Sequence, residues 1–328
     1  MNNNTYIIAE IGINHEGSIS NCKRMIEAAF NCGVDAVKLQ TINADANYVK
    51  GTKSHNVFKN SELTQNETQE AFNLANEFGI DIFTTVGDLE TMHWVDDLNP
   101  SHWKISSGLL THIPFIGQLA MLKRPLLMST GMADEIEIDL AMEEARLKGA
   151  TDISLFQCTS IYPTPFEEVN LSTIGWMKEK YQCPIGFSDH SDGDDAVFLS
   201  IAAGATLIEK HFSLDNSKNG FDHRVSMDEH GLKRMVERVR LAEKIMGNEK
   251  KKISKAVEKT RDNSLRYIVA TKPIAIGDRF SISNINIKRT LPGISGLEPK
   301  SYEDVIGQVS LSNIKIDQSI QSCDFQRI

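Results

Sequence analysis

The sequence lacks a surplus of positive charge and any long apolar run. Its 44 acidic residues outnumber the 35 basic ones, so the net charge is −9. General nucleic-acid binding, which needs a basic face, is therefore disfavoured. The apolar runs are too short to cross a bilayer. The first residues, MNNNTYIIAEIG, show neither the basic region nor the apolar stretch of a secretory signal, so we expect a cytoplasmic protein without membrane attachment.

Cysteine is also scarce. The five cysteines form an odd set without a CxxC pair: Cys22, Cys32, Cys158, Cys183 and Cys323. This spacing predicts reduced thiols and argues against structural zinc. The remaining composition, 41% hydrophobic and 24% charged, is that of an ordinary soluble globular protein.

Short β-branched runs alternate with longer segments of helical period. The expected strands are residues 6–12, 36–41, 81–86, 102–107, 126–130, 152–159, 184–190 and 206–212. Helix-like segments lie between them, several ending on a glycine that suits a helix C′ position, and a further amphipathic segment follows the eighth strand. Eight such units in about 245 residues predict an α/β fold of the (β/α)₈ or TIM-barrel type.

The pattern changes after the barrel. Residues 247–263 form a charged connector, and residues 264–328 alternate apolar and polar positions around an Ile-Gly-Asp turn signal. We therefore expect a barrel domain over 1–246, a linker over 247–263 and a small β-rich domain over 264–328. A domain of this size needs a neighbour for stability.

All eight expected strands begin apolar and end polar. Because the chemistry of such barrels lies at the carboxyl ends of the strands, these polar residues are candidate site residues. Lysines and hydroxyls suit a phosphate or carboxylate, and two histidines on adjacent strands suit a catalytic divalent metal. The strand-end residues are Glu10, Lys38, Gln40, Thr84, Thr85, Lys104, Ser106, Ser107, Ser129, Thr130, Gln157, Thr159, Ser160, Ser188, Asp189, His190, Glu209, Lys210 and His211.

Each assignment has a structural alternative. A single histidine at a strand end is commonly a hydrogen-bonded core residue, and only the pair favours a metal. Lys38 and Lys104 are either paired interior charges or ligand-binding groups, and the shortage of carboxylates beside them in the sequence favours ligand binding. Glu209 and Lys210 point to opposite sides of their strand. We interpret them as a paired charge in the barrel interior and a helix-facing salt bridge.

Four other features have structural interpretations. His15 and Glu16 belong to a turn before a helix capped by Ser18 or Ser20. His223 is expected to face solvent. Cys158 is expected to pack as a small apolar residue. The acidic run SDGDDA after His190 is expected to cap the next helix.

Several motifs together resemble the sialic acid synthases, which make nonulosonic acids from phosphoenolpyruvate (PEP) and an amino sugar. The barrel motifs are IIAEIGINHEGS, DAVKLQT, HWKISSG, LMSTGM, CTSIYPTPFEEVNL, IGFSDH, GATLIEKHF and FDHRVSM. The segment SLRYIVATKPIAIGDRFSISNINIKRTLPGISG resembles the antifreeze-like (SAF) domain of that family.

The resemblance implies a domain-swapped homodimer in which each small domain caps the partner's barrel. It implies that PEP condenses with an open-chain N-acyl amino hexose, releasing phosphate, while Glu10 handles a proton. His190 and His211 would hold a manganese or magnesium ion. The implied PEP-binding residues are Lys38, Thr85, Lys104, Ser107, Ser129 and Ser188. The implied sugar-binding residues are Gln40, Tyr162, Asp222 and, from the partner's cap, Arg289.

The sequence departs from the family pattern at three places. Leu109 replaces the usual glutamate of Ser-Gly-Glu, Val86-Gly87 replaces Pro-Phe, and Thr290 replaces the proline of Lys-Arg-Pro. We expect the change at Leu109 to favour a less hydroxylated acceptor, such as a deoxy or acylated sugar.

Two other functions fit parts of the pattern. One is another PEP-dependent or metal-dependent aldolase, such as a 3-deoxy-sugar phosphate synthase, which would need an extra basic cluster for its phosphorylated sugar. The other is a carbohydrate-binding protein without catalysis, in which Glu10, His190 and His211 would be free to change.

Overall fold

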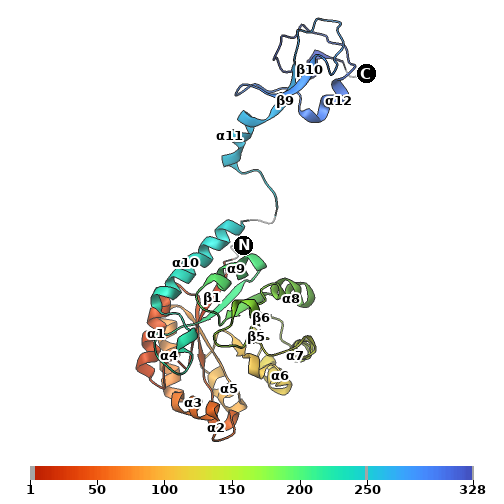
Figure 1. The fold of residues 1–328 in the computed structure, drawn as a ribbon. Helices are drawn as coiled ribbons and strands as arrows, with labels where there is room; N and C mark the ends of the chain where they lie inside the picture. Colours follow the sequence, from red (N-terminus) through yellow and green to blue (C-terminus); the bar gives the residue numbers. More distant parts are fainter. Residues whose placement is uncertain (1–3, 248–249, 327–328) are drawn as a thin grey trace. The chain divides into compact units, whose positions relative to one another are not determined.

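Eight parallel strands close into a barrel surrounded by helices (Figure 1). The structure, a computed structural model, describes residues 4–247 and 250–326. The strands pair in chain order, and β8 closes the barrel against β1, so the expected (β/α)₈ barrel is confirmed. The strands are β1 (Tyr6–Gly12), β2 (Ala36–Gln40), β3 (Asp81–Thr85), β4 (Trp103–Ile105), β5 (Leu126–Ser129), β6 (Ile153–Cys158), β7 (Ile185–Asp189) and β8 (Leu207–His211).

Local sequence signals set where the helices begin and end. Thr64 and Glu67 form a reciprocal capping box at the start of α4, and Gly79 ends that helix in the left-handed conformation. The barrel helices are α1 (Ile19–Asn31), α4 (Gln65–Phe78), α5 (Leu89–Asp96), α6 (Ile113–Met121), α7 (Glu135–Leu147), α8 (Thr173–Tyr181), α9 (Asp195–Ala203) and α10 (Glu229–Met246). Among the described residues, no helix is long and apolar enough to cross a membrane.

The barrel interior is apolar near the start of the strands and polar at their carboxyl ends. An apolar layer is formed by Ile8, Ala36, Phe83, Leu127, Phe156 and Leu207. Two residues further along each strand, on the same face, stand Glu10, Lys38, Thr85, Ser129, Cys158 and Glu209. Because every second side chain points into the barrel, a polar layer follows the apolar one at the carboxyl end of the strands. We call this end of the barrel the mouth.

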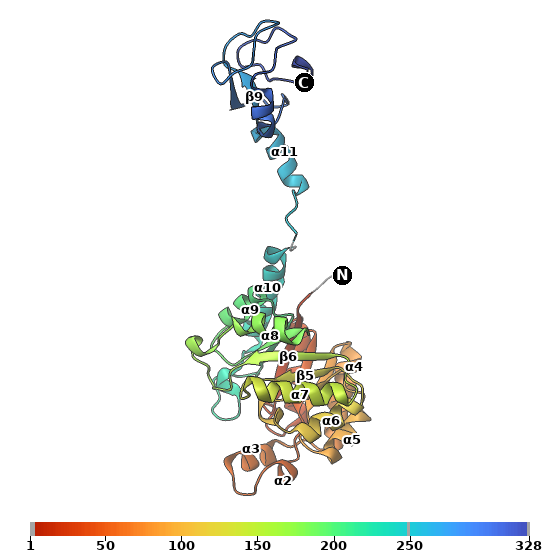
Figure 2. The same ribbon diagram turned by 90° about the vertical axis from the view of Figure 1, so that its right-hand side faces the viewer.

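One barrel connection is much longer than the others. After β2 the chain forms two extra helices, α2 (Ala44–Asn47) and α3 (Lys53–Ser61), before α4 begins. Figures 1 and 2 show these two helices together at the mouth, outside the ring of barrel helices. The segment is too short and polar to give a helical period, so the sequence did not predict it.

The chain divides into two compact units, Met1–Gly247 and Asn248–Ile328. The second contains α11 (Lys255–Ser264), the antiparallel pair β9 (Arg266–Ala270) and β10 (Ile285–Arg289), and the short helix α12 (Tyr302–Val305). The other strand-like runs make isolated bridges. Its small apolar core consists of Ile268, Ala270, Ile274, Phe280, Ile285, Val305, Ile314, Ile320 and Phe325.

Candidate active site

Two lysines converge on one carboxylate inside the mouth. Lys38 Nζ lies 3.1 Å from Glu209 Oε1, and Lys104 donates a hydrogen bond to Glu209 Oε2. Ser188 Oγ donates to Glu209 Oε1 at 3.1 Å, and Lys38 also pairs with Glu10 at 3.4 Å. Strands β1, β2, β4, β7 and β8 thus contribute one buried cluster of charges.

The charges in this cluster are strongly coupled. Burial raises the pKa of Glu10 to about 7, against the opposing effect of Lys38. Burial alone would also raise the pKa of Glu209, but Lys104 and Lys38 hold it well below its usual range. Burial lowers the pKa of Lys104 to about 8. The mouth therefore contains one permanent carboxylate, two ammonium groups and one glutamate that titrates near neutrality.

Glu209 corrects part of the sequence interpretation. The expectation that few carboxylates lie beside the lysines was wrong, because Glu209 pairs with both. The interpretation of Glu209 as a paired interior charge is confirmed. Lys210 points to the other side of β8 and pairs with Asp189 at 2.7 Å, which confirms the salt bridge expected outside the barrel.

His190 and His211 lie next to each other at the ends of β7 and β8. Their ring centroids are 5.4 Å apart. Burial lowers the pKa of His190 to about 4 and that of His211 to about 3, so both imidazoles are neutral at pH 7. The two rings are therefore at the same end of the barrel and in the protonation state that binds a metal.

The two histidines fit a divalent ion. His190 Nδ1 is 2.9 Å from the carbonyl oxygen of Thr159, which fixes this nitrogen as the donor and leaves Nε2 as a ligand. His211 Nδ1 is buried and has no hydrogen-bond partner, and the same is true of Glu10 Oε2. Within residues 4–247 and 250–326 no group of three His, Cys, Asp or Glu could hold a metal, so the protein would supply two ligands here.

Two expected sugar-binding residues lie beside this pair, and a third lies beside Glu10. The ring of Tyr162 lies 4.2 Å from that of His190 and 6.0 Å from that of His211. Asp222 Oδ2 is 3.7 Å from His211 Nδ1, and burial raises the pKa of its carboxyl. Gln40 Nε2 donates to Glu10 Oε1 at 2.7 Å.

The other expected PEP-binding residues have varied surroundings. Thr85 and Ser129 are buried at the ends of β3 and β5, and the Thr85 hydroxyl has no partner. Ser107 Oγ accepts from Gly131 N and contacts Cys158 Sγ at 3.2 Å. Burial raises the pKa of the Cys158 thiol, in keeping with its expected role in packing. Arg289 lies on β10 in the second unit, where it donates hydrogen bonds to the Asn263 carbonyl and to Ser264 Oγ.

The loop from β8 to α10 is tied to the loop after β1, which the sequence did not predict. His223 is 1% exposed, so the expectation that it faces solvent was wrong. Its Nδ1 lies 2.7 Å from Ser213 Oγ and its Nε2 lies 2.9 Å from Glu16 Oε1. Asn14 Oδ1 accepts from the backbone of Asp222 at 3.1 Å. These contacts fix the loop that carries Asp222.

Both capping expectations concern residues that precede a helix. Ser18 caps α1 by accepting from Asn21 N, as expected. Asp194 is the N-cap residue of α9 and Asp195 lies in its first turn, so the acidic run stands at the positive end of the helix dipole, as expected. The Asp194 side chain makes no capping hydrogen bond and forms ion pairs with Arg234 and Arg238 of α10.

The fold and the mouth define a TIM-barrel protein with paired lysines, a titrating glutamate and two neutral histidines at the carboxyl ends of its strands. The NeuB family model matches residues 25–251, and the SAF domain model matches residues 266–326. The chain therefore belongs to the NeuB family. This confirms the resemblance to the sialic acid synthases and the SAF domain expected at the C-terminal side.

Similar proteins are synthases of related sugars. N,N'-diacetyllegionaminic acid synthase from Campylobacter jejuni is 34% identical over 333 residues, covering 97% of this chain and 99% of that protein. Pseudaminic acid synthase from the same organism is 33% identical over 335 residues, covering 98% and 96%. N-acetylneuraminic acid (sialic acid) synthetase from Leptospira borgpetersenii matches with a TM-score of 0.76 and 29% identity, over 78% of this chain and 90% of that one. The expectation that the chain is an enzyme of this class is confirmed.

Proposed function

We propose that this protein condenses PEP with an open-chain N-acyl amino hexose to form a nonulosonic acid and release phosphate. Carbon 3 of PEP bonds to the aldehyde carbon of the sugar, water adds at carbon 2, and the carbon 2–oxygen bond to phosphate breaks. The observation that carries the proposal is the meeting of Lys38 and Lys104 with the His190–His211 pair at one mouth.

The phosphate and carboxylate of PEP are assigned to the lysine side of the mouth. Lys38 and Lys104 supply the positive charge. The hydroxyls of Thr85, Ser107, Ser129 and Ser188 supply neutral hydrogen bonds. The Thr85 hydroxyl is buried without a partner, which costs free energy unless a ligand satisfies it.

Glu10 is assigned the proton transfer. It lies beside Lys38 and Gln40, and its pKa near 7 lets it hold or release a proton at physiological pH. It would take the proton of the water that adds at carbon 2. A manganese or magnesium ion on His190 and His211 would supply Lewis acidity toward the aldehyde oxygen.

The acceptor is proposed to be an amino sugar with fewer hydroxyls than a simple hexosamine. Leu109 follows Ser107 in a short helical turn, and it packs against the apolar core of the barrel. A leucine there offers no hydrogen bond to a sugar hydroxyl, so a deoxy or acylated position is the better match. Gln40, Tyr162 and Asp222 are assigned to the remaining polar groups of the sugar.

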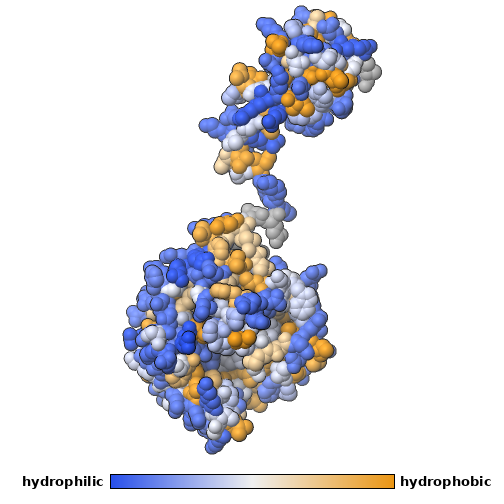
Figure 3. Space-filling view, viewed as in Figure 1, coloured by the Kyte–Doolittle hydropathy of each residue, from blue (hydrophilic) through white to orange (hydrophobic). Residues whose placement is uncertain are grey.

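A second copy of the chain is proposed to complete the site with Arg289. The second unit exposes several large apolar side chains, Ile276, Ile282, Leu291, Ile294, Leu311 and Ile316, and Figure 3 shows apolar surface of this kind on that unit. Exposed apolar surface on so small a domain supports contact with a partner.

The experiment is a phosphate-release assay with PEP and a panel of unphosphorylated N-acyl hexosamines, with and without a chelator. We expect release that depends on both sugar and metal, and a product with the combined mass of PEP, sugar and water minus phosphate. Release only with phosphorylated sugars would favour the aldolase alternative. Absence of sugar-dependent release across the panel would favour a binding protein.

A further inference from the structure

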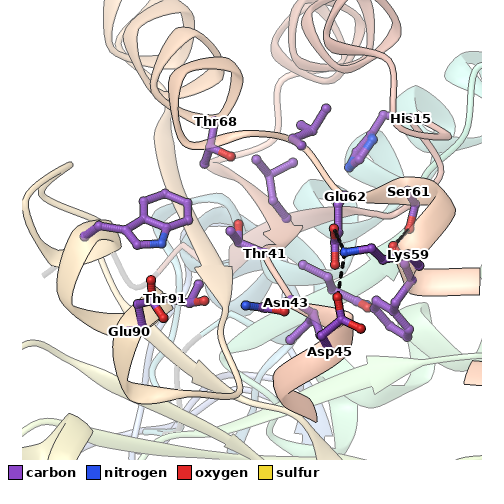
Figure 4. Close-up of a pocket in the computed structure, with 16 residues that line it drawn as sticks. His15, Thr41, Asn43, Asp45, Lys59, Ser61, Glu62, Thr68, Glu90 and Thr91 are labelled. Carbon is purple, nitrogen blue, oxygen red and sulfur yellow. Dashed lines mark hydrogen bonds and ion pairs between the residues drawn. The ribbon is translucent and has the colours of Figure 1, made fainter. Parts of the chain in front are cut away.

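A polar pocket of about 320 Å³ lies beneath the α2–α3 excursion (Figure 4). Its walls come from the loop after β1, the end of β2 with the excursion, and the first turns of α4 and α5. Gln40, which also bonds to Glu10, is one of the lining residues. The pocket therefore adjoins the mouth, and neither His190 nor His211 lines it.

The charges of the lining exclude an anionic ligand. Lys59 is bonded to Asp45 and Glu62, each at 2.9 Å (Figure 4). Burial lowers the pKa of His15 to about 4, so this ring is neutral at pH 7. Glu90 also lines the pocket. With the lysine already neutralised and a further carboxylate present, the pocket suits an uncharged ligand.

A buried hydroxyl in the pocket lacks a partner. Thr68 is 1% exposed, its Oγ1 has no hydrogen bond, and Figure 4 shows it directed into the pocket. An unpaired buried hydroxyl costs free energy that a bound donor or acceptor would recover. Trp94 adds an aromatic surface, and Gln40 and Asn43 add amides. Amides, a hydroxyl and an indole together suit the alternating polar and apolar faces of a sugar.

A glycine leaves room for a contact between two walls of the pocket. A Cβ atom on Gly87 would lie 1.8 Å from Asn47 Oδ1, so any side chain there would displace Asn47. Asn47 Nδ2 donates to the Asn43 carbonyl at 2.8 Å and to Asp88 Oδ2 at 3.2 Å. Because Asp88 caps α5, this contact holds the α2 wall of the pocket against the α5 wall.

We propose that this pocket binds a neutral sugar group through its hydroxyl or N-acyl substituents. The proposal deepens the proposed function, and it rests on that function only if the group belongs to the acceptor. One possible source is the distal end of the acceptor, reaching past Gln40 from the mouth. The other source is a second sugar that binds in this pocket alone. Both present the same chemistry to Thr68, Gln40 and Trp94.

The test measures sugar binding by titration calorimetry and saturation-transfer NMR. The probes are a fully hydroxylated N-acyl hexosamine, its 6-deoxy, diacylated counterpart and the alditol of each, added to the PEP-saturated His211→Ala chain, in which turnover is blocked. We expect Thr68→Val and Gly87→Ala each to weaken binding about tenfold. Gly175→Ala is the matched control, because no atom lies within 4 Å of the added Cβ. Unchanged PEP affinity and melting temperature show that each variant is folded.

The two sources give different results. If the acceptor enters the pocket, Thr68→Val raises the acceptor KM about tenfold with the PEP KM unchanged. If a second sugar binds, the stoichiometry is two sugars per chain and the acceptor KM does not move. Sugar binding that is absent, or that is equal in both pocket variants and the control, overturns the proposal. If the protein binds sugar in a Thr68-dependent way but releases no phosphate, the proposed function is contradicted and the pocket proposal stands.

Discussion

At the scale of single residues, the titration of Glu10 suits the proton transfer proposed for it. Burial raises its pKa from an ordinary 4.5 to about 7. The group therefore keeps its proton more readily in the folded chain than in the unfolded one. Its contribution to stability weakens as the pH rises from about 4.5 to about 7, the same range in which it becomes able to accept a proton.

We predict that kcat/KM rises with pH through about 7, since Glu10 must be ionised to take a proton from water. Glu10→Gln should lower kcat by about 10²–10⁴ and remove this ionisation from the profile. The measurement is kcat/KM against pH for both proteins. The amide mimics the neutral acid, so thermal unfolding at pH 6 should be unchanged. A profile that falls through this range would reverse the assigned direction of proton transfer.

A second prediction concerns Leu109. Leu109→Glu restores the carboxylate that is usual at this position in the family, and we expect it to shift the kcat/KM ratio toward a fully hydroxylated N-acyl hexosamine by about tenfold. The measurement compares that sugar with its 6-deoxy, diacylated counterpart. Leu109→Met keeps an apolar side chain of similar size and serves as the control. Equal ratios in all three proteins would remove Leu109 from acceptor selection.

At the scale of elements, the contact between the loops after β1 and β8 positions Asp222. Glu16 adopts φ of 55°, a left-handed conformation that is unfavourable for a glutamate. Its carboxylate nevertheless bonds to both Lys218 and His223. Because the backbone of Glu16 is strained and its side chain makes two tertiary contacts, we infer that these contacts hold the two loops together.

We predict that breaking this contact weakens acceptor binding. His223→Asn can retain the bond to Ser213, and His223→Gln the bond to Glu16, but each loses one of the two hydrogen bonds of this buried side chain, at a cost of about 0.5–1.5 kcal/mol. We expect the acceptor KM to rise about tenfold while the PEP KM stays within about twofold. Lys218→Ala removes only a half-exposed ion pair and should change little. A lower melting temperature with unchanged KM values would mean that His223 serves stability alone.

The strands and their polar ends could be predicted because both follow from simple periodicity. The polar strand ends placed Glu10, Lys38 and His211 together at the carboxyl end of the barrel. The alternation of side chains would have placed Glu209 between the lysines, had the parity of neighbouring strands been compared. The pocket under α2 and α3 could not be foreseen, because it depends on the absence of a side chain at Gly87 and on tertiary contacts of Asn47.

At the scale of the whole molecule, one residue proposed for the site, Arg289, belongs to the second unit. It lies on β10 in the second unit. The composition change near residue 247 indicated two parts. The alternation of residues within the second unit does not indicate whether that unit contacts its own barrel or the barrel of a second chain. The contribution of Arg289 to the site therefore stays a proposal.

Mixing two defective variants tests the swapped arrangement. His211→Ala disables the barrel and Arg289→Ala disables the cap, so each protein alone should be nearly inactive. After subunit exchange, half of the dimers carry both chains, and one of their two sites is intact if caps are swapped. We expect about a quarter of wild-type activity, measured as phosphate release. No recovery in a verified heterodimer would mean that each cap serves its own barrel.

Glu209 also bears on how the reaction ends. Without a shared carboxylate, two buried ammonium groups would bind inorganic phosphate tightly after the reaction. Release of the phosphate would then leave both positive charges buried and unpaired, which costs free energy. Glu209 pairs with both cations. If Lys38 and Lys104 hold the phosphate as proposed, Glu209 would compete with it for both ammonium groups and so favour release of the product.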